Sequence, residues 1–509
     1  MREKHMNKRQ LLFLRCGKVI FPLCFVLPGI INLIFYYLGQ SVEGNLFRKY
    51  GFIGGNILYA IVAGVTLMLC IKNKKLSKRL IIIFACLVIY FVGCFCVSWM
   101  KFGIQPRSVD YFEQFICFCL PALAAGICGT LFKGEKSFGY IINKLSLFAL
   151  PAVLIYLYKA IFDEDNFLGN RNLGLLNYMN VAYIFMPFLM AEVDWLVTNG
   201  KEKIKNKFLL VLWHSIFTVM LWYAILASGT RGTYICIIAF CFMYLAIRLL
   251  KKKEVKVIGL ITFLLTFFMF FNIYIYECPG LYAVSRMKIF LDGLAQNQFV
   301  TSVTEEKGME HLENVVEMEM EEGKIVLSQE GETVDGEQQE GQSQENVVEM
   351  EEGKIVLSQE GEMVDGEQQE GQSQENVFKM ANRGSYYKVA IKEFLNSPII
   401  GMGPMGYSVK YGTYPHNVIL ELLCELGLIG AVPLLLLIIF VLFKIYNRML
   451  KCEELEIVFL FFIIYALYAN MSGTIWTCKE VFGALGYSLT YCIKTNKTKN
   501  LDVGEVVEK

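Results

Sequence analysis

The sequence has little charge for its length and few of the residue types that build active sites in soluble enzymes. Only 19% of its 509 residues are charged and only 4 are histidine, whereas 55% are hydrophobic. Soluble domains carry about 25% charged residues, and one soluble core cannot bury this much apolar surface. The scarcity of charge therefore excludes a soluble globular protein and indicates a membrane protein.

The formal net charge of +1 is the sum of two opposite parts. Residues 304–378 contain 23 acidic residues and 3 lysines, a net charge of −20, so the rest of the chain has a net charge of +21. The basic residues are spread along the chain rather than gathered in one tract, which argues against nucleic-acid binding. The chain is thus an apolar, basic protein with an acidic insert.

Apolar stretches long enough to cross a bilayer recur along the chain. A bilayer core about 30 Å thick needs about 20 mostly apolar residues per helix. Twelve stretches qualify: 19–39, 52–71, 80–100, 114–132, 140–161, 172–191, 208–230, 232–250, 257–276, 427–443, 457–478 and 481–493, the last being short. They predict an all-α polytopic membrane protein with about 12 transmembrane helices, nine in residues 1–276 and three in 416–493.

The lysines and arginines predict how these helices are oriented. With a cytoplasmic N-terminus, the inner segments carry 30 of them, the short outer loops carry 8, and 10 lie in the long segment 277–415. Basic residues accumulate on the cytoplasmic side of membrane proteins. We therefore expect both termini, including the tail 494–509, in the cytoplasm and a long extracytoplasmic loop at 277–415. The first apolar stretch is too long for a cleavable signal peptide.

The long loop contains a tandem duplication. The segment 321–347 recurs at 351–377 with one change, from Thr333 to Met363. Each copy has few apolar residues to bury, so we expect the acidic tandem repeat within 304–378 to be disordered; a role in cation binding or as a spacer is the alternative. On its flanks, apolar residues at helical spacing predict amphipathic helices near 285–297 and 385–396.

Two of the histidines lie in predicted spans or at their ends. His416 lies at the outer end of a span, after Pro415, which is suited to the first turn of a helix. A histidine with a near-neutral pKa is suited to proton transfer, and a histidine that merely sits at the membrane interface is the alternative. His214 lies inside a span, where a packed, hydrogen-bonded histidine is the simpler interpretation.

Several arginines fall on the outer side, against the usual distribution of positive charge. Arg231 lies in a tight connection between two spans, Arg286 and Arg383 begin the two amphipathic helices, and Arg171 lies in an outer loop. A guanidinium group binds phosphate oxygens in a bidentate manner, most strongly at a low-dielectric boundary. Together with His416 they indicate a site for a lipid diphosphate. Contact of Arg231 with anionic lipid headgroups is the alternative.

Three motifs, in this order, resemble the O-antigen polymerase/ligase superfamily. They are SGTRG (228–232) between two spans, NSPIIGMGPMGYS (396–408) after the long loop, and PHNVILELLCELGLIG (415–430) at the start of the next span. The superfamily has an arginine after a serine between two spans, a segment NP-x-x-G-x-G, and a segment HN-x-x-L-x-x-x-x-E-x-G-x-x-G. This chain departs from that pattern in Ser397, which separates Asn396 from Pro398, and in its acidic insert.

The resemblance implies a GT-C-like membrane glycosyltransferase that uses a polyprenyl-diphosphate-linked oligosaccharide as donor and needs no metal and no other cofactor. It implies that Arg231 and Arg383 hold the donor diphosphate and that His416 acts as the catalytic base on the acceptor hydroxyl. Arg286 is a weaker third candidate ligand of the diphosphate. Arg171 is a candidate only because of its charge and its predicted side of the membrane.

The expected function is therefore that of a polymerase that joins lipid-linked repeat units of a capsule, exopolysaccharide or O-antigen on the outer face of the cytoplasmic membrane. A ligase that transfers the glycan to another acceptor and a transporter or flippase of the lipid-linked sugar are the alternatives. The expected partners are the lipid-linked donor and acceptor, membrane lipid, a flippase and a chain-length regulator, but no nucleic acid.

Overall fold

The chain divides into two units, which are described separately. The larger unit comprises residues 1–288 and 380–509, and the smaller unit comprises residues 289–379. The computed structural model describes residues 8–37, 45–72, 76–104, 106–129, 138–163, 167, 178–204, 208–253, 255–274, 324–327, 346–351, 354–358, 383–450 and 452–498. Within these ranges every element of the larger unit is helical, which confirms the predicted helical class for this unit.

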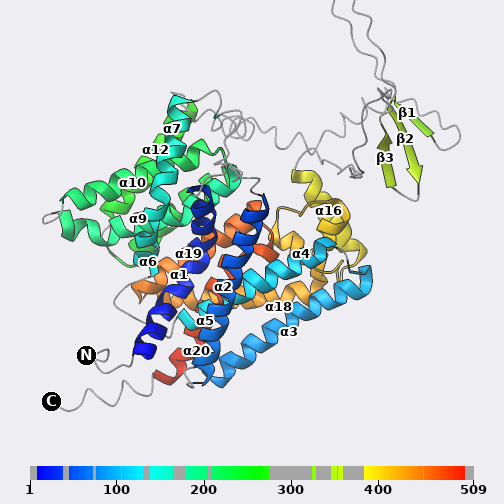
Figure 1. The fold of residues 1–509 in the computed structure, drawn as a ribbon, viewed down its shortest axis with the longest axis horizontal. Helices are drawn as coiled ribbons and strands as arrows, with labels where there is room; N and C mark the ends of the chain where they lie inside the picture. Colours follow the sequence, from blue (N-terminus) through cyan, green and yellow to red (C-terminus); the bar gives the residue numbers. More distant parts are fainter. Residues whose placement is uncertain are drawn as a thin grey trace, which may run out of the picture. The chain divides into compact units, whose positions relative to one another are not determined.

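The helices of the larger unit are shown in Figure 1. Those before the long loop are α1 (Lys8–Tyr37), α2 (Asn45–Lys72), α3 (Lys78–Phe102), α4 (Pro106–Gln114), α5 (Leu120–Gly129), α6 (Phe138–Leu145), α7 (Leu150–Phe162), α9 (Tyr178–Ile204), α10 (Phe208–Ala227), α11 (Arg231–Leu250) and α12 (Lys256–Tyr274). Those after it are α16 (Arg383–Asn396), α17 (Gly406–Tyr411), α18 (Val418–Met449), α19 (Glu453–Ser472) and α20 (Lys479–Thr498). Short turns of other helix types lie at Phe115–Cys119, Ser146–Ala149 and Ile475–Thr477.

Nine helical segments of the described residues are long and apolar enough to cross a membrane. They coincide with nine of the predicted spans, although α9 begins six residues later than the span predicted at 172–191, at Tyr178. The other three predicted spans, 19–39, 457–478 and 481–493, lie on α1, α19 and α20. The chain is thus a multi-pass membrane protein, and the count of twelve spans stays a prediction.

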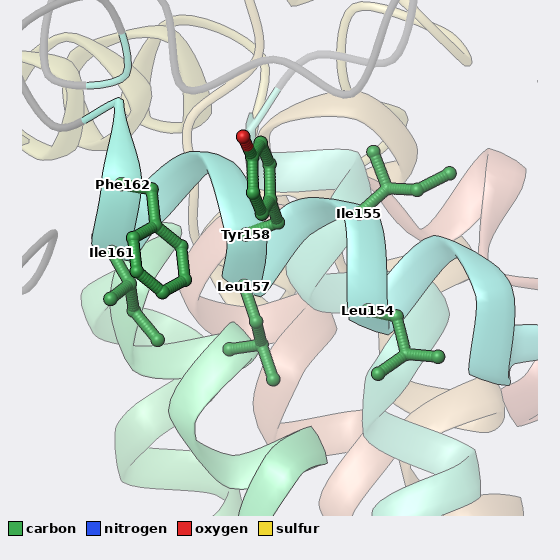
Figure 2. Close-up of a pocket in the computed structure, with 6 residues that line it drawn as sticks. All are labelled: Leu154, Ile155, Leu157, Tyr158, Ile161 and Phe162. Carbon is green, nitrogen blue, oxygen red and sulfur yellow. The ribbon is translucent and has the colours of Figure 1, made fainter.

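Many large apolar side chains lie on the outside of the helices, as expected for a surface that contacts lipid tails. They include Leu58, Met68, Ile89, Phe263 and Phe443, each more than half exposed. Figure 2 shows one such surface on α7, where a pocket is lined by Leu154, Ile155, Leu157, Tyr158, Ile161 and Phe162. The exposed apolar surface gives the structural reason for the low charge of the sequence.

Helices α5 and α20 pack so closely that their backbones touch. A Cβ atom added to Gly126 of α5 would overlap the carbonyl oxygen of Gly483, and one added to Gly486 of α20 would overlap the carbonyl oxygen of Leu123. Small residues permit this approach between membrane helices. Helix α20 also contacts α18 and α19, so it is joined both to the N-terminal half and to the last helices of the larger unit.

A charged network joins α11 to α19 at the end that the sequence predicts to be cytoplasmic. Arg248 Nε lies 3.0 Å from Glu456 Oε1, and Lys251 Nζ lies 2.7 Å from Glu456 Oε2. Farther along, the thiol of Cys236 is 3.8 Å from the carbonyl oxygen of Ile464. The last turn of α11 therefore meets the first turn of α19, and the two helices run antiparallel. The first residue of α11, Arg231, consequently lies toward the end of α19.

The smaller unit contains a three-stranded antiparallel sheet in the order β1-β2-β3, with β1 at Lys324–Leu327, β2 at Asn346–Glu351 and β3 at Lys354–Ser358. Val326 pairs with Val347, and Met350 pairs with Ile355. The sequence predicted no strands. β1 and β3 contain the Ile-Val-Leu run of the two repeat copies and β2 contains Val347 and Val348, and these β-branched residues favour strands. The rest of the predicted disordered repeat, and the helix predicted at 285–297, lie outside the described residues.

Candidate functional site

His416 lies in the turn between α17 and α18. Its φ angle is +55°, a left-handed conformation that is uncommon for residues other than glycine. The side chain of the next residue, Asn417, caps α18 by accepting a hydrogen bond from the N–H of Leu420 at 3.0 Å. The prediction that Pro415 lies in the first helical turn is therefore wrong. The asparagine cap starts the helix at Val418, and His416 precedes it.

Two tyrosine rings contact the imidazole of His416. The ring centroid of Tyr414 lies 4.3 Å away and that of Tyr386, on α16, lies 5.5 Å away. Tyr407 fixes α16 in this place, because its hydroxyl donates to the carbonyl oxygen of Tyr386 at 3.1 Å. His416, Tyr386 and Tyr414 are each half-buried. The histidine is thus held between aromatic rings and keeps a face toward the outside of the protein.

Helix α18, which begins at Val418, is interrupted at Gly427, about two and a half turns later. Gly427 has φ +60° and ψ −171°, which breaks the helical hydrogen bonds on both sides. On the N-terminal side of the break, the carbonyl oxygens of Cys424 and Glu425 accept from the N–H groups of Met402 and Gly403 at 2.8 and 2.7 Å. On the C-terminal side, the N–H groups of residues 428 and 429 donate to the carbonyl oxygens of residues 398 and 399 at 2.8 and 3.1 Å.

These four hydrogen bonds satisfy backbone groups that could find no partner in a lipid environment. They also explain two glycines of the recognised motifs. A Cβ on Gly401 would overlap the backbone of Glu425, and a Cβ on Gly427 would overlap the backbone of Ile399. The segments NSPIIGMG and ELG therefore form one backbone junction, which fixes α18, and with it His416, against the end of α16.

Helix α3 supports this junction from the other side. Lys101 Nζ donates to the carbonyl oxygen of Gly401 at 2.9 Å, and Ser98 Oγ donates to that of Pro404 at 3.3 Å. On the same helix, the hydroxyl of Tyr90 donates to the carbonyl oxygen of Gly430 at 2.6 Å. Lys101 was counted in the sequence only as one of the outer basic residues. Its backbone contact could not be predicted, because the partner lies 300 residues away in the chain.

Two buried carboxylates of α18, one turn apart, bind the turn at Ile475–Thr477. Glu421 accepts from the hydroxyl of Thr474 and from the N–H of Ile475 at 3.1 Å. Glu425 accepts from Trp476 Nε1 at 2.6 Å and from the N–H of Met405 at 2.9 Å. These carboxylates are therefore occupied as structural acceptors. Sequence reasoning missed Glu421, although two acids spaced by four residues in an apolar helix are a signal for a polar role.

Outside the membrane-spanning helices, Glu393 joins α16 to α17. It accepts from Lys410 Nζ at 2.9 Å and from the hydroxyl of Tyr411. Burial by itself would raise the pKa of Glu393, but the hydrogen bonds from Tyr411 and Lys410 outweigh it and lower the pKa below its ordinary value. Burial raises the pKa of Tyr411, and its hydrogen bond to the Glu393 carboxylate raises it further. Glu393 is thus a charged anchor for the helix that contacts His416.

Two of the arginines that the sequence singled out are the first residues of helices. Arg383 is the first residue of α16, one turn before Tyr386. Arg231 is the first residue of α11 and lies toward the end of α19, which leads into the turn held by Glu421. The side chains of Arg231 and Arg383 lie outside the described part of the structure, as do Arg286 and Arg171 altogether.

The second span-associated histidine has the structural role expected of it. His214 is 8% exposed, its Nδ1 lies 2.6 Å from Glu192 Oε2, and its ring stacks on Trp195. Glu192 also accepts from the hydroxyl of Ser146 at 2.7 Å. Among the described residues no group of three or more His, Cys, Asp or Glu side chains could hold a metal ion.

The fold and this site define a multi-pass membrane protein with a backbone junction beside His416, and comparison with known proteins adds a family match. The family model described as O-antigen ligase matches residues 216–435, from α10 into α18. This part of the chain is therefore similar to the O-antigen ligase family, which supports the resemblance drawn from the three motifs. No curated protein matches the chain. The function is accordingly of the polymerase/ligase type, on lipid-linked oligosaccharide substrates.

Proposed function

We propose that the protein is a polymerase that joins polyprenyl-diphosphate-linked oligosaccharide repeat units of a surface polysaccharide. The observation that carries the proposal is the position of His416. It is held by Tyr386 and Tyr414 beside the first turn of α16, which begins with Arg383, while α11 begins with Arg231 toward the end of α19. A base and two guanidinium groups on one side of a membrane protein suit transfer of a sugar from a lipid diphosphate.

In the proposed reaction, His416 accepts the proton of the acceptor hydroxyl as the oxygen attacks the anomeric carbon of the donor sugar. The bond from that carbon to the diphosphate oxygen breaks, and the electron pair leaves with the polyprenyl diphosphate. Arg231 and Arg383 stabilise the negative charge that develops there, with Arg286 and Arg171 as further candidate ligands. Direct displacement inverts the configuration of the anomeric carbon, and this scheme uses neither a metal nor a nucleotide sugar.

The proposed place of the reaction is the extracytoplasmic face of the cytoplasmic membrane, with both termini in the cytoplasm. The basic residues support this orientation, because 30 of them fall on the inner segments and 8 on the short outer loops. A flippase would have to deliver the lipid-linked units to that face, and a chain-length regulator would act on the product.

A ligase is the second candidate, because the matching family model is described as O-antigen ligase. Glycan length in a strain that lacks the gene distinguishes the two. Loss of a polymerase leaves acceptors that carry a single repeat unit, whereas loss of a ligase leaves long chains still bound to the lipid carrier. Long lipid-linked chains in the deletion strain would therefore overturn the polymerase and support the ligase.

The deletion strain also tests the arginines. Arg231→Ala and Arg383→Ala should abolish chain growth at normal membrane levels, and Arg231→Lys should restore little of it, because lysine keeps the charge but not the bidentate fork. Lys444→Ala, at the end predicted to be cytoplasmic, is the matched control and should leave glycan length unchanged. Wild-type chain length in Arg231→Ala would remove that residue from the site.

A further inference from the structure

A cavity of about 250 Å³ lies beside the backbone junction, between α17 and the connection from α3 to α4. Its lining includes Ser98, Ser108 and Met402, which are buried, and Val409 and Lys410 of α17, which are more exposed. The cavity therefore has a closed floor and an open mouth. The proposed transfer reaction gives it no role, so what it holds is a separate question.

The cavity lies on the side of the membrane where we place the reaction. In the orientation that the basic residues predict, residues 101–110 form a short outer loop. Gly103 and Ser108, which both line the cavity, belong to this loop. His416, at the end of the long loop, lies on the same predicted side. A ligand of the cavity would therefore come from the side that also supplies the substrates.

Helix α17 separates the cavity from the surroundings of His416. Val409 and Lys410 line the cavity on one face of this helix. On another face, the hydroxyl of Tyr407 donates to the carbonyl oxygen of Tyr386, whose ring contacts His416. An α-helix with its side chains is about 10 to 12 Å across. A glycan of a few sugars bound at His416 is therefore long enough to reach the cavity.

The lining of the cavity combines hydrogen-bonding groups with apolar surface. Ser108 accepts from Trp99 Nε1 at 2.7 Å, so its own O–H can donate to a ligand. Ser98 donates to a backbone carbonyl oxygen at 3.3 Å, and its oxygen can still accept. Met402 and Val409 add apolar surface beside the two hydroxyl groups. A sugar ring matches this combination, because it has hydroxyl groups around its edge and C–H groups on its faces.

The charge of the lining favours a neutral ligand. Lys410 Nζ lies 2.9 Å from Glu393 Oε1, which offsets its charge, and the other lining residues are uncharged. A diphosphate would need cationic groups that are available to bind it. A lipid tail would cover the hydroxyl groups of Ser98 and Ser108 without offering them a hydrogen bond, which is costly. Both the diphosphate and the tail of the donor are therefore poorer ligands than its sugars.

We propose that this cavity binds one uncharged sugar ring of the lipid-linked oligosaccharide, away from the bond that is transferred. The inference rests on the proposed transferase function and adds to it a second place at which the glycan is held. The cavity is smaller than the pockets of about 300 to 1,000 Å³ that hold drug-sized ligands, so it suits a single ring. Binding of a part of the substrate that does not react helps to position the part that does.

Two probes test the cavity separately from the donor site. One is the repeat-unit oligosaccharide, prepared by partial acid hydrolysis of the surface polysaccharide of the wild-type strain, and the other is polyprenyl diphosphate. Binding of each is measured to the purified full-length protein, in a detergent without a sugar headgroup. Val409→Phe fills the cavity, and Ser108→Ala removes one hydroxyl from it. Ile391→Phe, at an exposed position of α16, adds a ring outside the cavity and is the matched control.

The oligosaccharide should bind about 10-fold or more weakly to Val409→Phe and about 3- to 10-fold more weakly to Ser108→Ala. It should bind to Ile391→Phe as to the wild type. Polyprenyl diphosphate should bind equally to all four proteins, because the cavity does not hold it.

Equal affinity of the wild type and both cavity variants for the oligosaccharide would overturn the proposal, as would a wild-type protein that does not bind it. Variants that weaken polyprenyl diphosphate alone would also overturn it and would assign the cavity to a lipid tail. If Val409→Phe loses both probes, it has not folded, and Ser108→Ala decides. Failure of the polymerase function itself gives a different result, because the deletion strain then lacks acceptors with a single repeat unit, whichever probes the protein binds.

Discussion

At the scale of single residues, the backbone conformation of His416 allows its chemical role to be tested apart from any structural role. Its φ of +55° has an energetic cost that the surrounding structure must offset, and such residues gather at functional sites. Asparagine tolerates this conformation, so His416→Asn removes the base without straining the turn. We expect glycan polymerisation to fall by roughly 10²- to 10⁴-fold at normal membrane levels. His311→Asn, in the acidic insert, is the control, and chain growth in His416→Asn equal to that control would refute the catalytic base.

Glu393 gives the site a predictable dependence on pH. Its folded-state pKa lies below the ordinary value of 4.5, so its ion pair with Lys410 stabilises the protein fully above that value. The stabilisation is lost as the pH falls from about 4.5 through the lowered pKa, because protonation removes the charge. We expect the thermal midpoint of the purified protein to drop over this range. Glu393→Gln should start lower at pH 7 and lose this part of the dependence; an unchanged pH profile in that variant would exclude the role.

At the scale of elements, the junction between residues 398–403 and the break in α18 should tolerate no side chain at Gly427. Gly427→Ala places a Cβ against the carbonyl group of Ile399 at a φ of +60°. We expect it to destabilise the folded protein by at least about 3 kcal/mol, through steric overlap and left-handed strain. Gly259→Ala in α12 meets nothing within 4 Å and is the matched control. Thermal unfolding in detergent, followed by size-exclusion chromatography, should separate the two variants clearly.

The same junction marks how far the sequence could predict the site. Apolar length was enough for nine spans, and short motifs were enough for the family resemblance, because these patterns are local. The pairing of the Met402 N–H with the Cys424 carbonyl, and the contact of Trp476 with Glu425, join segments that no periodicity connects. The sequence shows Gly401 and Gly427 as parts of motifs. Only the structure shows why glycine is needed there, which is the close approach of two backbones.

At the scale of the whole molecule, two polar regions lie at opposite ends of α11 and α19. The pairs of Arg248 and Lys251 with Glu456 hold one end, and the turn that leads to Lys479 lies at the other. The basic-residue count predicts residues 248–256 inside and 471–480 outside, so the predicted orientation puts these two regions on opposite sides of the membrane.

The acidic repeat supplies the negative part of the chain's net charge, and its removal should leave the function of the protein almost unchanged. Residues 289–379 form a unit of their own, and β1 and β3, one from each repeat copy, pair with β2. Deleting 321–377 removes this sheet and roughly halves the connection between α12 and α16, which changes the free energy of loop closure by only about 0.6 kcal/mol. Glycan length and membrane level should therefore stay at wild-type values. Deletion of the single copy 348–377 is the graded control. A complete loss of polymer in the larger deletion, with the smaller one active, would show that one copy is required and that the insert is more than a spacer.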